Sequence, residues 1–383
     1  MSERTTGTGE APPEAGEAPH IPEAGEAPHY DLAVVGAGVV GALTAYYAVQ
    51  RDPGRRVAVL AHTGRGSGAT RLSAGFDTPT GHNPAQRALA ARSTALFHKL
   101  AAALGDAGRT PVDVRWLVAR AHTAALDATL ADGGRTLPVT GEQRDLLDRA
   151  FPGLAHGDDE VLLSTDPMTA GQPQWLTDRL LDAVLDGPGN TLLEGFRVTG
   201  VRRSGGRVEL LAADGSRITA DRAVIAPGPW ALDGPVAAAA RERGARVKKV
   251  VAFHIMTPPP PDAPALVLED ADAFLLPHRP GGHWIFSITS PDWDRGPDEP
   301  LAIDARDRAL ARDLLARYVP GFLPHLLGGR VFSDCFTPGH LPVVDTVDGD
   351  DVVMAIGGSG SGYRLAPAMA EDALNLLDGR TRT

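Results

Sequence analysis

A short apolar run that leads through closely spaced glycines into a helical pattern constrains this chain more than any other feature. The apolar segment, Leu32 to Val35, is typical of a strand buried on both faces. Glycines follow at 36, 38 and 41, the spacing G-x-G-x-x-G. Gly36 suits the tight turn, Gly38 lets the backbone approach a pyrophosphate, and Gly41 lets helix and strand pack closely. The order of strand, glycines and helix predicts a dinucleotide site with its phosphates over the helix N-terminus.

Composition narrows the classes of partner. The 383 residues are 43% hydrophobic and 22% charged, as in ordinary globular chains, and the formal net charge is −11. This charge disfavours nucleic acid and anionic membranes as partners, and no apolar segment approaches the roughly 20 residues of a membrane span. The single cysteine, Cys335, excludes an intramolecular disulfide and favours a cytoplasmic location. The dispersed histidines lack zinc-ligand spacing, so no metal site is predicted.

The first 29 residues differ from the rest of the chain. They contain six glutamates, one arginine and two copies of PEAGEAPH, at 13–20 and 22–29. A segment dominated by Pro, Glu, Gly and Ala cannot bury enough apolar surface to offset the entropy of ordering. Residues 1–29 are therefore predicted to form a disordered acidic leader.

Further elements extend the first unit. Arg56 to Leu60 is a second buried strand, which completes a β-α-β unit. Gly64 to Asp77 is glycine-rich and is predicted to be a loop, too irregular for helix or strand. Asn83-Pro84, an N-cap followed by a first-turn proline, predicts the start of a helix. Other elements are predicted at 173–185 (a helix), at 191–201 and 206–212 (short strands) and at 220–230 (a buried strand).

The second half of the chain has a different pattern. Three β-rich stretches, at 247–256, 265–277 and 282–290, suggest a separate antiparallel sheet. Asp351 to Ile356 is one more buried strand, which runs into GGSGSGY and a final helix at 365–377. Because this last strand, loop and helix resemble the first, the β-rich part is predicted to be an insertion between parts of one sheet.

Five stretches occur in the following order: YDLAVVGAGVVG, GRGSGATRLSAGF, ADRAVIAPGPWA, TPGHLPVVD and AIGGSGSGYRLAP. Together they resemble the FAD-dependent amine oxidases of the D-amino-acid, glycine and sarcosine oxidase family. The resemblance implies FAD as cofactor and an α/β fold (α+β overall), with a Rossmann-like FAD-binding domain in discontinuous segments and a substrate domain with a large mixed or antiparallel sheet. It assigns 30–90, 165–235 and 336–383 to the FAD-binding domain, and 91–164 and 236–335 to the substrate domain.

The resemblance also implies roles for individual residues. Arg71 would lie beside the flavin, and Tyr363 would belong to the catalytic site. Arg364 would bind a substrate carboxylate with its planar guanidinium, although a capping role or an ion pair is the open alternative. The residues implied to contact FAD are Gly36, Gly38, Val39, Val40, Gly41, His62, Ser67, Gly68, Ala69, Thr70, Arg71, Gly228, Gly358, Ser359, Gly360, Gly362, Tyr363 and Arg364.

Three features depart from the family. Ala61 and His62 stand where the second strand normally ends in an acid that binds the adenosine ribose. Sarcosine oxidases carry an oxygen-activating lysine on the strand matching GGHWIFSI, where this chain has Trp284 and no lysine nearby. Cys335 lies near the position of the cysteine that binds FAD covalently in monomeric sarcosine oxidases, but out of register, so covalent and free flavin both stay open.

The expected activity is oxidation of a C–N bond in a small amino acid or secondary amine to an imine, by hydride transfer to the flavin. Dioxygen or another acceptor would then reoxidise the flavin. Two alternatives stay open: an NAD(P)-dependent dehydrogenase, and a flavin-binding protein without catalysis. The histidines at 82, 254, 278 and 340 are candidate pocket residues, each also compatible with a structural role. The substrate and the oligomeric state do not follow from the sequence.

Overall fold

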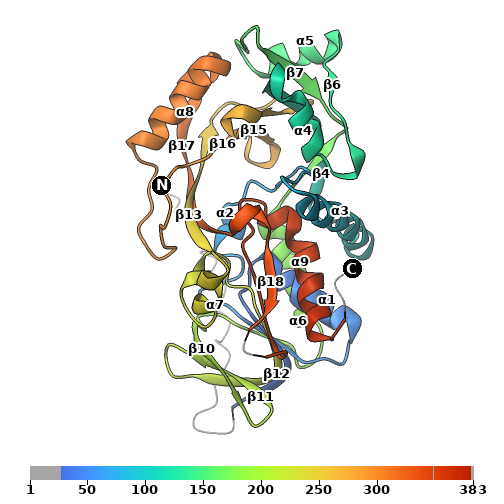
Figure 1. Ribbon diagram of the computed structural model, residues 1–383, viewed down its shortest axis with the longest axis vertical. Coiled ribbons are helices and arrows are strands. Elements are labelled where there is room, and N and C mark those ends of the chain that lie inside the picture. Colours follow the sequence, from blue (N-terminus) through green and yellow to red (C-terminus); the bar gives the residue numbers. More distant parts are fainter. Residues whose placement is uncertain (1–26, 348, 381–383) are drawn as a thin grey trace, which may run out of the picture.

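The computed structural model describes residues 27–347 and 349–380, arranged around two large sheets (Figure 1). The predicted acidic leader lies outside the described residues, apart from its last three positions, and His29 already belongs to the first strand. Within the described ranges, no helix combines the length and the apolar character needed to cross a bilayer.

The first sheet has eight strands and contains the predicted β-α-β unit. β1 (His29–Val35) runs parallel to β2 (Val57–Leu60) on one side and to β12 (Arg217–Ile225) on the other. β12 also pairs in parallel with β19 (Val352–Ile356), so the last buried strand joins the sheet that begins with β1, as predicted. The other strands are β9 (Thr191–Leu193), β10 (Val198–Ser204), β11 (Arg207–Ala212) and β18 (Val343–Thr346).

Alternate residues of these strands belong to separate cores on the two faces of the sheet. Leu32 and Val34 pack into the core beneath the helices, whereas Ala33 and Val35 belong to the core of the other face. In Figure 1, three of these helices run side by side over the lower part of the molecule. They are α1 (Val39–Arg51), α6 (Pro173–Leu185) and α9 (Gly362–Leu377), and α3 (Pro84–Leu104) packs on α9.

Helix starts agree closely with the sequence patterns. Asn83 caps α3 as predicted, because its Oδ1 accepts a hydrogen bond from the Gln86 backbone N–H at 2.9 Å. α6 has the predicted bounds. α9 begins at Gly362, three residues before the predicted start, and Pro367 lies inside it.

The second sheet also has eight strands and is mixed. β13 (Arg246–Ile255) is antiparallel to β16 (His283–Ile288) and to β17 (Leu326–Phe336). The three β-rich stretches at 247–290 pair antiparallel with one another, as predicted, and the sheet is mixed because β14 (Ala265–Leu268) pairs in parallel with β5 (Val114–Ala119). That pairing joins distant parts of the chain and leaves no local pattern. The sheet is completed by β15 (Ala273–His278), β7 (Glu160–Ser164) and β6 (Leu137–Pro138).

One face of the second sheet carries a core of large aromatic side chains. Trp284 lies 5.0 Å from Phe151 and 5.5 Å from Phe322, measured between ring centroids. Residues of α5 (Gly141–Ala150) and α8 (Ala305–Tyr318) join this core. The smaller elements include α4 (Thr123–Thr129), α7 (Ala237–Glu242) and a three-stranded sheet of β3 (Phe76–Asp77), β8 (Met168–Gly171) and β4 (Arg109–Val112).

The stretch Gly64 to Asp77, predicted to lack helix and strand, contains both. α2 spans Ala69–Leu72, and β3 pairs antiparallel with β8. The Gly66 N–H also donates to the Ala37 carbonyl at 2.8 Å. Local sequence did not reveal α2 and β3 because partners distant in sequence stabilise these short elements, as they do the pairing of β14 with β5.

Candidate active site

The turn between β1 and α1 has the close packing that its glycine spacing predicts. Gly36 adopts a φ of 106°, and a Cβ there would lie 2.2 Å from the Ala226 carbonyl oxygen. A Cβ on Gly41 would lie 1.8 Å from the Gly36 carbonyl oxygen. Thr70 accepts a hydrogen bond from the Val39 N–H at 3.0 Å, which fixes α2 against the start of α1. The positive end of the α1 dipole is therefore held beside a tight backbone turn, an arrangement that stabilises phosphate.

A cavity of about 120 Å³ lies beside this turn at the end of β2. Ala61 and His62 line it, and the His62 ring stands edge-on to Trp230 at 5.3 Å. Burial, reinforced by the charge of Arg197, lowers the pKa of His62. Among the described residues, Asp233 is the carboxylate that lines this cavity. Asp233 comes from the segment after β12, which carries no motif, whereas the end of β2 has no acid. The predicted contacts Ser67, Gly68, Ala69 and Gly228 line the same cavity.

A second cavity, of about 500 Å³, lies next to the first. One wall comes from the phosphate turn and from the loop at 357–364. The other comes from the second sheet and includes Trp116, Val267 and Phe274. The two cavities meet along shared lining residues, so together they provide an elongated space that fits a dinucleotide with its phosphates at the α1 N-terminus. The shared residues are Gly38, Ala69, Thr70, Ala226 and Gly228.

The loop at 357–362 lines the larger cavity, but its backbone is partly occupied by other groups. The Ser359 N–H donates to the Cys335 carbonyl at 3.0 Å, and the Gly360 N–H donates to the Asp334 carboxylate at 2.8 Å. Gly358 and Gly362 have no backbone N–H bond within the described part of the chain. Of the residues of this loop implied to contact FAD, these two have backbone N–H groups that remain available to a ligand.

Arg364 lines the larger cavity at the start of α9 and is only 8% exposed. Its guanidinium donates to both Thr78 and Thr80, the latter at 2.6 Å, and to the Ser361 hydroxyl at 2.8 Å. Burial lowers the pKa of Arg364 to about 10, with Asp77 opposing the shift, so the group stays charged at pH 7. A substrate carboxylate would have to share this cation with three hydroxyl groups.

The other two predicted catalytic residues lie in different surroundings. Tyr363 lines the larger cavity, and its hydroxyl is buried against Gly171 without a hydrogen-bond partner among the described residues. Arg71 is exposed and lines neither cavity. The structure therefore brings Tyr363 and Arg364 together at the cavity and leaves Arg71 outside it.

Cys335 lies on β17 and lines the larger cavity, although it is almost fully buried. Burial, together with the neighbouring charge of Asp334, raises the pKa of its thiol to about 12. A thiol that stays protonated is a poor nucleophile, which favours a flavin held without a covalent bond.

The four candidate histidines fall into two groups. His82 and His340 line the larger cavity, with their rings edge-on at 5.2 Å. His254 and His278 instead pack on His283, at centroid distances of 4.4 and 4.7 Å. This second group does not line the cavity, which agrees with a structural role.

A lysine does reach the larger cavity, from the strand that pairs with the one carrying Trp284. Trp284, at the position compared with the family lysine, is buried in the aromatic core on the far side of its strand. Lys248, on the neighbouring strand β13, lines the cavity and packs over the rings of Trp293 and Phe336. Burial lowers its pKa. The sequence did not reveal the position of Lys248, because the pairing of distant strands decides which lysine lies at the cavity.

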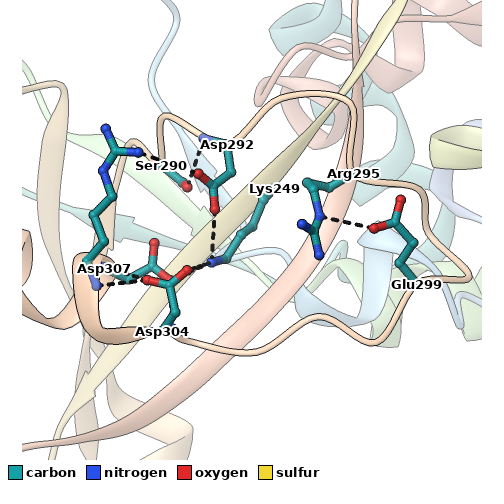
Figure 2. Close-up of polar contacts among 8 residues, drawn as sticks. Lys249, Ser290, Asp292, Arg295, Glu299, Asp304 and Asp307 are labelled. Carbon is teal, nitrogen blue, oxygen red and sulfur yellow. Dashed lines mark hydrogen bonds and ion pairs between the residues drawn. The ribbon is translucent and has the colours of Figure 1, made fainter.

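The adjacent residue, Lys249, is paired rather than free (Figure 2). Its Nζ lies 2.8 Å from Asp304 and 2.6 Å from Asp307, with Asp292 at 3.4 Å. Figure 2 shows the three carboxylates converging on the ammonium from the loop after β16 and from the start of α8. Burial opposes the charge of Lys249, but the hydrogen bonds to Asp304 and Asp307 outweigh it and raise the pKa.

Comparisons with known proteins agree with the overall fold. Glycine oxidase from Geobacillus kaustophilus superposes with a TM-score of 0.74 at 20% identity, covering 92% of this chain and 95% of that chain. L-proline dehydrogenase from P. horikoshii gives 0.75 at 20% identity, covering 93% and 96%. Iminodiacetate oxidase from Chelativorans sp. BNC1 gives 0.72 at 19% identity, covering 92% and 96%. A search of curated protein sequences found no match.

At these identities the superpositions establish the fold alone. The family comparison establishes more than the fold, because residues 31–376 match the family described as FAD dependent oxidoreductase. The match includes the phosphate turn, both cavities and the terminal loop. FAD is the cofactor of that family, which excludes the nicotinamide alternative. The chain belongs to the FAD-dependent oxidoreductase family.

Proposed function

We propose that the protein oxidises the C–N bond of a small amino acid or secondary amine to an imine. The observation that carries the proposal is the larger cavity, which joins the phosphate turn to a wall of apolar and charged side chains from the second sheet. FAD supplies the hydride acceptor when bound. The names of the similar structures, two amine or amino-acid oxidases and a proline dehydrogenase, support the same class of substrate.

The residues present fit this cofactor and this substrate class. The turn at 36–41 would hold the pyrophosphate. The free N–H groups of Gly358 and Gly362 would donate hydrogen bonds to the edge of the flavin ring. Trp116, Val267 and Phe274 line the cavity with apolar surface, which would keep water away from the substrate. Arg364 and Lys248 are the cations available to a substrate carboxylate, and they orient the amine by holding the other end of the molecule.

The partners follow from the same reasoning. A small amine or amino acid is the substrate, and dioxygen or another acceptor completes the cycle. The buried thiol of the single cysteine is compatible with a cytoplasmic enzyme.

The test is an absorption spectrum of the purified protein, followed by anaerobic titration with a panel of amines. A yellow protein that bleaches with one class of amine, and recovers when air is admitted, is the expected result. A protein that binds FAD but is bleached by no amine would instead indicate a flavin-binding protein without this catalysis. Recovery only with an added electron acceptor would identify a dehydrogenase.

A further inference from the structure

The charged residues that line the larger cavity differ in how many hydrogen bonds and ion pairs they form within the protein. Arg364 bonds to three hydroxyl groups and Lys249 to carboxylates. Asp334 accepts backbone bonds from Cys335 and Gly360. Glu269 differs from them, because its carboxylate has no hydrogen bond or ion pair with any described residue.

Glu269 is held in the cavity by its place in the fold. It lies in the turn between β14 and β15, half-buried, on the wall that also carries Trp116, Val267 and Phe274. This is the wall from the second sheet, away from the phosphate turn. A carboxylate without a partner in such surroundings loses hydration and gains nothing in exchange.

The neighbouring acids of the same turn are already satisfied. Asp270 accepts from the Ala119 N–H at 2.6 Å, lies beside His122 and does not line the cavity. Asp272 lines the cavity and accepts from the Thr289 hydroxyl at 2.5 Å. Burial, and then the charges of Asp272 and Asp270, raise the pKa of Glu269. A cation placed at Glu269 would offset each of these unfavourable effects.

We propose that Glu269 binds a second cationic group of the substrate, so that the enzyme acts on an amine or amino acid carrying an additional ammonium. This inference rests on the proposed function and specifies its substrate class. The nitrogen next to the C–H bond that is broken must be uncharged, because its lone pair forms the C=N bond as the hydride leaves carbon, whereas the partner of Glu269 stays charged. The site thus distinguishes the two amino groups of one substrate molecule by their charge.

The test compares chain-matched pairs of amino acids that differ only in a terminal ammonium. The pairs are 2,3-diaminopropionate with alanine, 2,4-diaminobutyrate with 2-aminobutyrate, ornithine with norvaline, and lysine with norleucine, each as both enantiomers. Binding to the FAD-loaded protein is measured by calorimetry, and flavin reduction is measured anaerobically. We expect at least one diamino acid to bind about 10–100-fold more tightly than its partner, the range of a charge-assisted hydrogen bond.

Two variants locate the effect. Glu269→Gln keeps the size of the side chain and should abolish the preference within each pair. Asp270→Asn, in the same turn but outside the cavity, should keep it. Equal binding within all four pairs, or a preference that survives in Glu269→Gln, would overturn the inference. Flavin reduction without such a preference leaves the proposed function intact, whereas a preference in binding without flavin reduction by any amine defeats the proposed function alone.

Discussion

The two halves of the site are built in different ways. The half around the first sheet is made mainly of backbone, in a glycine turn at 36–41 and a glycine-rich loop at 357–362, each continuous in sequence. The half around the second sheet is made of side chains from strands far apart in the chain, such as Trp116, Lys248 and Phe274. The first half can therefore be identified from short motifs, and the second depends on how distant strands are ordered.

Because the first half is built from closely packed backbone, we expect a glycine-to-alanine change there to cause the largest loss of stability. In Gly41→Ala the added Cβ meets the Gly36 carbonyl at 1.8 Å, so β1 and α1 must separate. We expect a loss of more than about 4 kcal/mol in unfolding free energy, measured by chemical denaturation.

Gly38→Ala is the matched control for that change. A Cβ there would meet only the Thr70 hydroxyl, at 3.1 Å. We expect it to retain the fold and to weaken FAD retention, because the methyl group stands at the phosphate turn. Equal losses of stability in the two variants would contradict the view that close backbone packing at Gly41 stabilises this half of the site.

In the second half, the largest effect on stability is expected at Lys249. Lys249→Met leaves the buried Asp307 carboxylate without its cation. The expected loss is about 3 kcal/mol, near the low end for a broken buried pair because Asp292 and Asp304 are partly exposed. Arg295→Gln is the control, since it breaks an exposed pair with Glu299 worth no more than about 0.5 kcal/mol.

The histidine group predicts an acid-sensitive second half. Burial, with smaller contributions from His283 and Arg330, lowers the pKa values of both His254 and His278 to about 4. Unfolding returns them to about 6.5, so the unfolded state binds more protons between these values and stability falls as the pH drops from 6.5 to 4. We expect a loss of about 1–3 kcal/mol in total, after allowance for solvent screening of these partly exposed rings.

The measurement is unfolding free energy as a function of pH for the natural protein and for His254→Gln/His278→Gln. The double variant should lose less stability across this range than the natural protein. An identical pH dependence would show that carboxylates, rather than these rings, control it.

The smallest expected effect concerns substrate binding by Lys248. Lys248→Met should weaken binding of carboxylate-bearing amines about tenfold, or roughly 1.4 kcal/mol, relative to matched amines without a carboxylate. Titration of the flavin spectrum with each pair measures the ratio. If the binding of both amines in a pair weakens equally, Lys248 contributes through packing rather than through its charge.

The motifs located the phosphate turn at 36–41 and the loop at 357–362, whereas three kinds of feature escaped them. The parallel pairing of β14 with β5 and the short elements α2 and β3 depend on partners distant in sequence. Asp233 reaches the smaller cavity from a segment with no motif. Glu269 looks like any other surface acid in the sequence, and only its position in the cavity distinguishes it.

By itself, the sequence determined the glycine turn at 36–41, the β-α-β unit around it and the family. It could do so because backbone geometry at 36–41 requires glycine at fixed short spacings, and such requirements remain readable in a linear chain. The tertiary structure alone decided that Arg71 lies outside the cavity, that Lys248 rather than residue 284 faces it, and that Glu269 has no partner there among the described residues. Those facts depend on which faces of distant strands are brought together, and no short segment of sequence contains that information.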